Sequence, residues 1–189
     1  MLLAVLLAAL GMAWVAQTRR QHASVEALRT SNPGATVLYD DRRPGDAEDE
    51  SMWRRWARRQ LGADYVATVT GVELFYATDA DLVRVGRLSQ LKWLSLVRSV
   101  DLTDAGLAHL SGLEKLETLI LLDAEQVTDA GLRQLEQLTQ LKHLRIHLGR
   151  HAVSNEALER LSDALPNCKI EVGEALKDGE VREIAALTN

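Results

Sequence analysis

Three histidines at a regular spacing are the residues that most readily suggest chemistry. His143, His147 and His151 follow one another at intervals of four residues. On a helix, this spacing would bring three imidazoles to one face, where they could bind a transition metal. The apolar pattern around them instead predicts a strand, on which about 3.3 Å per residue separates His143 from His147 by about 13 Å. Because one metal ion cannot bridge that distance, we expect no metal site and no cofactor.

The other potentially reactive residues also indicate a protein without catalytic activity. Cys168 is the single cysteine, which excludes an internal disulfide, and it fills an apolar strand position typical of a core residue. The sequence contains no phosphate-binding glycine loop, no H-E-x-x-H helix and no nucleophile elbow. A formal net charge of −5 argues against a nucleic-acid partner. We therefore expect neither an enzyme nor a small-molecule substrate.

A repeated unit of about 25 residues organises most of the chain. Residues 91–113 and 116–138 both read L-x-x-L-x-L, a short loop, T-D-A-G-L and then leucines three positions apart. Weaker copies begin at residues 69 and 141, and a fifth strand begins at residue 165. Such self-similarity predicts a solenoid, and the L-x-x-L-x-L core is typical of a leucine-rich repeat. Solenoids bind partners along an extended surface, so the sequence favours recognition over catalysis.

The expected fold class is α/β, a short solenoid with parallel strands on its concave face, helices on its convex face and a hydrophobic helix at its N-terminus. Period-two alternation directs one set of strand residues inward, toward the helices. This inward set comprises Leu94, Leu96, Leu119, Leu121, Leu144 and Ile146. Thr103, Thr128 and Ser154 stand where helix N-caps are expected. Asp104 and Asp129 follow in the first turn, where the helix dipole favours a carboxylate.

The outward strand residues form the candidate binding surface. An exposed apolar patch is expected from Phe75, Trp93, Val97, Ile120 and Leu122, and a basic strip beside it from His143, Arg145 and His147. On the last strand the expected outward residues are Asn167, Lys169 and Glu171. Exposed apolar patches mark interaction sites, and aromatic and arginine residues are common anchors there. The alternative is that the N-terminal segment or the C-terminal tail of the same chain covers this face.

An apolar run occupies residues 1–18 and is followed by Arg19 and Arg20. As a helix, residues 1–16 would span about 24 Å at about 1.5 Å each, which is short of a hydrocarbon core about 30 Å thick. We expect an uncleaved membrane anchor; the alternatives are a cleaved signal peptide, with secretion of the repeats, and a buried helix. For an anchor, the positive-inside rule places the repeat domain on the cytoplasmic side.

The rest of the chain divides into three segments. Residues 19–62 are expected to contain a juxtamembrane helix, a short strand at 36–39, an acidic linker and a capping helix over 52–61. That last helix carries Trp53, Trp56 and four arginines, so it suits either the end of the solenoid or an anionic membrane surface. Residues 63–172 form the repeat domain, about four repeats and a terminal strand. Residues 173–189 form a C-terminal tail or cap.

The phrase T-D-A-G-L with L-x-x-L-x-L resembles ribonuclease-inhibitor-like leucine-rich repeats, and nearly the whole chain resembles short planctomycete repeat proteins. The second resemblance rests on S-V-E-A-L at 24–28, V-L-Y-D at 37–40 and L-G-A-D at 61–64. It implies a solenoid behind an N-terminal hydrophobic segment and assigns no activity. The chain departs from the general repeat where asparagine or cysteine is usual in the loop, at Ala77, Ser99, Ala124 and Gly149.

The functional expectation is a membrane-anchored protein-interaction module that binds an unidentified protein on its concave face. A structural or self-associating spacer near the membrane, without a dedicated partner, is the alternative. An exposed apolar concave face favours the interaction module, whereas a polar or covered face would favour the spacer.

Overall fold

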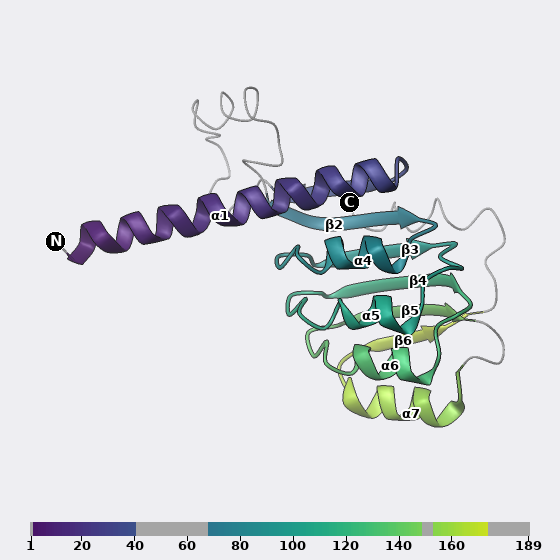
Figure 1. Ribbon diagram of the computed structural model, residues 1–189. Helices are drawn as coiled ribbons and strands as arrows, with labels where there is room; N and C mark the ends of the chain where they lie inside the picture. Colours follow the sequence, from purple (N-terminus) through teal and green to yellow (C-terminus); the bar gives the residue numbers. More distant parts are fainter. Residues whose placement is uncertain (1, 41–67, 149–152, 174–189) are drawn as a thin grey trace.

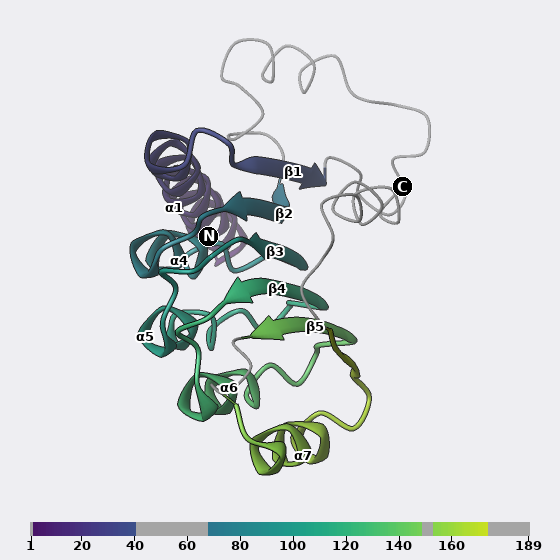
Figure 2. The same cartoon turned by 90° about the vertical axis from the view of Figure 1, so that its right-hand side faces the viewer.

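A computed structural model describes residues 2–40, 68–148 and 153–173, with the backbone alone at residues 2–15, 40 and 148. Its strands form one sheet in sequential order from β1 to β6, and the short helices lie along one face of that sheet (Figures 1 and 2). The elements are α1 (Leu2–Ser31), β1 (Thr36–Asp40), β2 (Thr68–Phe75), α4 (Asp79–Val85), β3 (Trp93–Val97), α5 (Asp104–Ala108), β4 (Thr118–Ala124), α6 (Asp129–Leu135), β5 (His143–Leu148), α7 (Asn155–Ala164) and β6 (Lys169–Val172). The expected α/β solenoid architecture is confirmed.

Strands β2 to β6 pair in parallel, and each pair is joined through one helix. The register aligns Trp93, Thr118 and His143 across β3, β4 and β5, as the repeat spacing predicts. The last strand differs, because Lys169 rather than Asn167 stands opposite His143. Helix α7 is longer than the other repeat helices, so more residues precede the start of β6. Because side chains alternate between the two faces with a period of two, this register shift of two residues leaves Lys169 and Glu171 on the face predicted for them.

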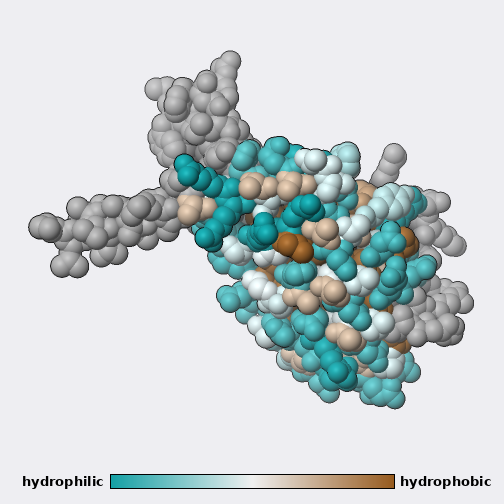
Figure 3. All heavy atoms as spheres, in the orientation of Figure 1, coloured by the Kyte–Doolittle hydropathy of each residue, from teal (hydrophilic) through white to brown (hydrophobic). Residues whose placement is uncertain are grey.

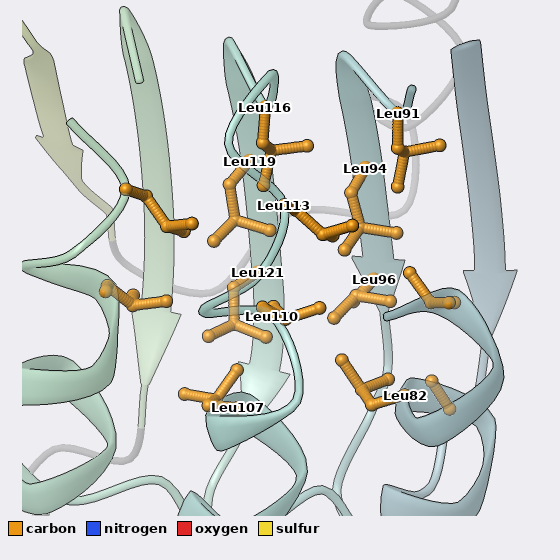
Figure 4. Close-up of a cluster of buried hydrophobic side chains, with 14 of the residues drawn as sticks. Leu82, Leu91, Leu94, Leu96, Leu107, Leu110, Leu113, Leu116, Leu119 and Leu121 are labelled. Carbon is orange, nitrogen blue, oxygen red and sulfur yellow. The ribbon is translucent and has the colours of Figure 1, made fainter. Parts of the chain in front are cut away.

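The core lies between the sheet and the helices and consists mostly of leucine. Leu94, Leu119 and Leu144 occupy one row across three strands and are fully buried. Leu107 of α5 and Leu110 in the turn after it meet these rows from the other side (Figure 4). Burying one such side chain contributes about 1.5–3 kcal/mol. The expected inward set is therefore confirmed.

The N-terminal end of the solenoid is closed by α1 and β1. Val25 and Leu28 of α1 are fully buried in the main core, and β1 pairs antiparallel with β2, placing Val37 opposite Val72. The side-chain amide of Asn32 donates to the carbonyl of Phe75 at 2.5 Å. Helix α1 thus packs against α4 in the place where a preceding repeat would lie. The capping helix expected over residues 52–61 lies outside the described residues.

A row of aspartates connects each repeat helix to the next. The carboxylate of Asp79 accepts hydrogen bonds from the backbone N–H and the hydroxyl of Thr103, at 2.9 and 2.7 Å. Asp104 makes the same pair of bonds to Thr128, at 2.8 and 2.6 Å. Asp129 makes it to Ser154, at 2.8 and 2.7 Å. We call this set the aspartate ladder.

The aspartate ladder also explains the glycine of the T-D-A-G phrase. A Cβ atom added at Gly106 would collide with Oδ1 of Asp79, and one at Gly131 would collide with Oδ1 of Asp104. The glycine leaves space for the carboxylate of the preceding repeat. The threonines and Ser154 keep their expected N-cap role as well, because each hydroxyl accepts a backbone N–H of its own helix.

Residues 2–18 of the predicted membrane anchor form the first part of α1, a helix that is continuous from Leu2 to Ser31. In the described part of the chain, we find no helix with the length and apolarity needed to cross a membrane. The side chains up to residue 15 are outside the described part, so membrane attachment and location stay predictions.

Candidate binding surface on the concave face

The outward residues of β2 to β5 stand in three rows across the sheet. The first row runs Gly71, Trp93, Thr118, His143, and the second runs Glu73, Ser95, Ile120, Arg145. In the third row, Phe75 stands opposite Val97 and Leu122 stands opposite His147. The register places all eight predicted surface residues on one face of the sheet, opposite to the face whose leucines join the main core. Figure 2 shows the helices on one side of the sheet only.

The apolar members form a distinct cluster, which we call the concave cluster. Val97, Ile120 and Leu122 pack together, and Phe75 and Trp93 pack against them, separately from the main core. The sequence predicts contiguity correctly, but the expected exposure is wrong for three members. Val97, Ile120 and Leu122 are 3%, 5% and 2% exposed, whereas Phe75 and Trp93 are half-buried. Period-two alternation assigns a residue to a face of the sheet and cannot show whether that face is covered.

Glycine at position 71 allows the indole of Trp93 to lie across the neighbouring strand. A Cβ at Gly71 would stand 3.2 Å from the ring of Trp93 and 2.9 Å from the side chain of Leu38. Any larger residue at this position would therefore press on both side chains. Trp93 packs at the edge of the concave cluster and remains partly exposed.

Charged groups flank the concave cluster on its β5 side. His143 is exposed and Arg145 is half-buried, while His147 places Nδ1 at 2.8 Å from Oδ1 of Asp123. On β6, Lys169 forms an ion pair with Glu171 at 2.6 Å. The hydrogen bond from Lys169, with its positive charge, lowers the pKa of Glu171. The expected basic strip is thus partly balanced by carboxylates.

Glu73 gives the opposite, β2 side of the face a carboxylate. Burial raises the pKa of Glu73 above its ordinary value. It stands in the same row as Ser95, which is buried, and as Ile120 and Arg145. Alternation along β2 puts Glu73 on the same face as Phe75, but its partial desolvation depends on neighbouring strands that only the fold brings together.

Three strand ends carry non-glycine residues in the left-handed backbone region, a feature that the sequence analysis does not foresee. Tyr76, Arg98 and Asp123 have φ values of 57°, 54° and 56°. Tyr76 is 62% exposed, and its hydroxyl is 3.5 Å from Nη1 of Arg98. Aspartate tolerates this conformation, whereas tyrosine and arginine adopt it rarely. The strained backbone therefore recurs at the ends of β2, β3 and β4.

One side chain replaces the expected asparagine in the loop that follows the strands. Ser99 is fully buried, and its hydroxyl accepts a hydrogen bond from the N–H of Ala77 at 3.3 Å. Ala124 at the next equivalent position is also fully buried. Gly149 lies outside the described residues. Serine therefore supplies one of the side-chain bonds that an asparagine ladder would make.

The residues considered for metal binding or nucleophilic chemistry do not assemble into a site. His143 and His147 lie on β5, and His151 is outside the described residues. In residues 2–40, 68–148 and 153–173, no group of three or more His, Cys, Asp or Glu side chains could hold a metal ion. Cys168 packs against the main core, as expected, and burial raises the pKa of its thiol.

The other surfaces offer weaker candidates. The helical face in Figure 3 is mostly hydrophilic, with apolar residues scattered among polar ones. A hollow of about 410 Å³ lies between α1 and the turn before β3, with Arg20 and Arg87 in its lining. Polar and apolar groups line this hollow in similar amounts, and its lining brings together no set of catalytic side chains, so the concave face is the stronger candidate.

The sequential, mostly parallel sheet, the convex helices and the leucine core make this protein a short leucine-rich-repeat-like solenoid. No family model matches the chain. A search of curated proteins also gives no match. Among solved structures, the chain is similar to a leucine-rich-repeat protein of Leptospira interrogans, with 25% identity over 47% of this chain and a TM-score of 0.33. The chain spans 21% of the length of that protein.

Proposed function

We propose that this protein is a non-enzymatic interaction module that binds a protein partner on its concave face. The proposal is supported by one observation above all: Phe75 and Trp93 border the concave cluster and remain partly exposed. Arg145 lies on the same face, two strands from Trp93. Aromatic and arginine side chains beside an apolar centre are the usual anchors of protein interfaces.

Trp93 has the properties of the main anchor. Its indole offers a large apolar area with few rotatable bonds, and it packs against the concave cluster on one side. Binding through a side chain that is already held in place costs little conformational entropy. The ring nitrogen is a hydrogen-bond donor that a partner carbonyl would satisfy.

A crosslinking pull-down with the full chain, followed by titration with the captured partner, tests this proposal. Trp93→Ala should weaken capture by about 2 kcal/mol, within the range of interface hot spots, which is about 30-fold in affinity. Arg133→Ala, on the exposed surface of α6, is the matched control and should leave capture unchanged. Normal capture by Trp93→Ala together with a lower melting temperature would mean that Trp93 serves only stability.

We extend the proposal to membrane attachment through residues 1–18. Helix α1 joins this apolar run to the buried residues Val25 and Leu28 without a break. Deleting residues 1–18 should therefore release a folded, soluble repeat domain. Cell fractionation and circular dichroism check this outcome. Aggregation of the deletion variant without a native helix signal would assign the apolar run to the core instead.

A self-associating spacer is the second candidate, and β6 is the feature that favours it. In the described part of the chain, β6 pairs with β5 alone, and its Val172 is 60% exposed. Such an edge strand can pair with another chain. Analytical ultracentrifugation of the wild type and Val172→Lys distinguishes the two functions, because a spacer of this kind should dissociate in the variant.

A further inference from the structure

The burial of the concave cluster requires a covering that the sheet itself does not supply. Val97, Ile120 and Leu122 lie on the outer side of the sheet, yet they are almost as inaccessible as the leucines of the main core. Among the described apolar residues, only Phe75 and Trp93 pack against them, and both are only half-buried themselves. Two half-buried neighbours on the same face of the sheet do not account for burial this complete.

We propose that the C-terminal segment, residues 174–189, occupies the concave face and covers this cluster. The segment begins after Gly173, the residue that directly follows β6. The N–H of Gly173 donates to the carbonyl of Ile146 on β5 at 3.0 Å. The segment therefore leaves the sheet two strands from Ile120 on β4. Two strand spacings amount to about 10 Å, whereas its residues can extend over about 50 Å.

The composition of the segment matches the face. It has apolar residues to place on the concave cluster, namely Leu176, Val181, Ile184 and Leu187. Its charged residues are Glu174, Asp178, Glu180 and Glu183 against Lys177 and Arg182, four acidic and two basic, so its net charge is −2. The β5 and β6 side of the face presents His143, Arg145 and Lys169 against Glu171. An acidic, apolar segment is complementary to that surface.

This arrangement has a consequence for binding, which rests on the proposed function. A partner that uses the concave face has to displace the segment, so the segment acts as an intramolecular competitor. Its local concentration would be high because the tether is short. Weakening the segment should then strengthen partner capture, whereas weakening Trp93 should reduce it.

Thiol labelling of the full chain tests the inference without any partner. In a Cys168→Ala background, Ile120→Cys reports on the covered position, and His143→Cys reports on an exposed position of the same face. We expect Cys at 120 to react at least about tenfold more slowly than Cys at 143, as for a site that reacts only after local opening. Ile184→Asp combined with Leu187→Asp should raise the rate at 120 by about tenfold and leave the rate at 143 unchanged.

Thr188→Asp is the matched control, because it adds a charge to the same segment without removing an apolar residue. A synthetic peptide of residues 174–189, added to the Ile184→Asp and Leu187→Asp variant, should slow labelling at 120 again. Melting curves establish that each variant is folded. An unchanged labelling rate at position 120 in the Ile184→Asp and Leu187→Asp variant would overturn the inference. A labelling rate that depends on protein concentration would also overturn it, because it would identify a second copy as the cover. Either result leaves the pull-down test of the concave face unaffected.

Discussion

Ser31, the last residue of α1, donates its hydroxyl to Oδ1 of Asp81 at 2.6 Å across fifty positions of sequence. Asp81 is buried in α4, where its other oxygen accepts from the N–H and hydroxyl of Thr78 at 3.1 and 3.0 Å, and Arg84 lies at 3.3 Å. It stands where later repeats have glycine. The first repeat receives no ladder aspartate from a preceding repeat, so a carboxylate of its own fills the space.

Replacing Asp81 by alanine should destabilise the solenoid at its N-terminal end. The change leaves the N–H of Thr78 without its carboxylate acceptor and leaves the hydroxyl of Ser31 with only the carbonyl of Leu28, at 3.3 Å. The loss of such an acceptor costs about 1–3 kcal/mol for a buried group. Ser31→Ala should cost about 1 kcal/mol. Urea unfolding followed by circular dichroism measures both. Glu26→Ala, on the exposed side of α1, is the control, and an equal loss in that variant would contradict the role given to Asp81.

A double-mutant cycle on Asp104 and Gly131 tests the aspartate ladder. Gly131→Ala should cost more than about 1 kcal/mol, because the added methyl group overlaps the carboxylate of Asp104. Asp104→Ala should also destabilise, since Thr128 loses both acceptors. The double variant should be more stable than the sum of the two losses predicts.

Gly112→Ala provides the control for this cycle, because a Cβ at Gly112 meets no atom within 4 Å. That change should alter the free energy of unfolding by about 0.5 kcal/mol or less. Strict additivity of Asp104→Ala and Gly131→Ala would mean that the two sites do not interact through space.

Acid should weaken the contact between α6 and α7. Hydrogen bonds from the backbone and the hydroxyl of Ser154 lower the pKa of Asp129 below its ordinary value of 3.8. Because the folded pKa is the lower one, the stabilisation is fully present above 3.8 and is lost as the pH falls through the folded value. Asp129→Asn should therefore be less stable than the wild type at neutral pH, with a difference that shrinks in acid. Urea midpoints across that range measure the effect, and a constant difference would rule it out.

Leu119 and Glu117 should respond very differently to truncation. Leu119 is fully buried between sheet and helices, so Leu119→Ala should cost about 2–5 kcal/mol. Glu117 forms an exposed ion pair with Lys142 at 2.6 Å, and the hydrogen bond from Lys142 lowers the pKa of Glu117. Such surface pairs contribute little, so Glu117→Ala should cost about 0.5 kcal/mol or less. Similar losses at the two positions in thermal melts would contradict the observed strand register.

Sequence reasoning predicts the repeat fold well because its determinants are local. The alternation of Leu119 and Leu121 sets which face of β4 is buried, and Thr128 with Asp129 marks the start of α6. These patterns recur in each unit, so an ambiguous assignment in one repeat is resolved by the same pattern in the next repeat. The register of β6 departs from prediction because α7 has no equivalent length in the other repeats.

The sequence was less informative wherever segments distant in the chain meet. Val25 and Leu28 show no sign in their own surroundings that they pack against α4, and the hydrogen bond between Ser31 and Asp81 joins residues that lie outside any shared motif. The same holds for Ile120, whose position on the outer face is predictable and whose burial is not. Local periodicity contains no information about a segment that arrives from elsewhere.

The aspartate ladder has an evolutionary consequence. At each of the three junctions, a threonine or serine N-cap of one unit bonds the aspartate of the unit before it, so the junctions share one chemistry. Duplication of one unit within the gene would create a junction of a kind already present and widen the concave face by one strand without altering the existing core. Asn155 stands in α7 where Asp104 and Asp129 stand in α5 and α6. The α7 unit therefore lacks the carboxylate through which Asp79, Asp104 and Asp129 each join their own unit to the next.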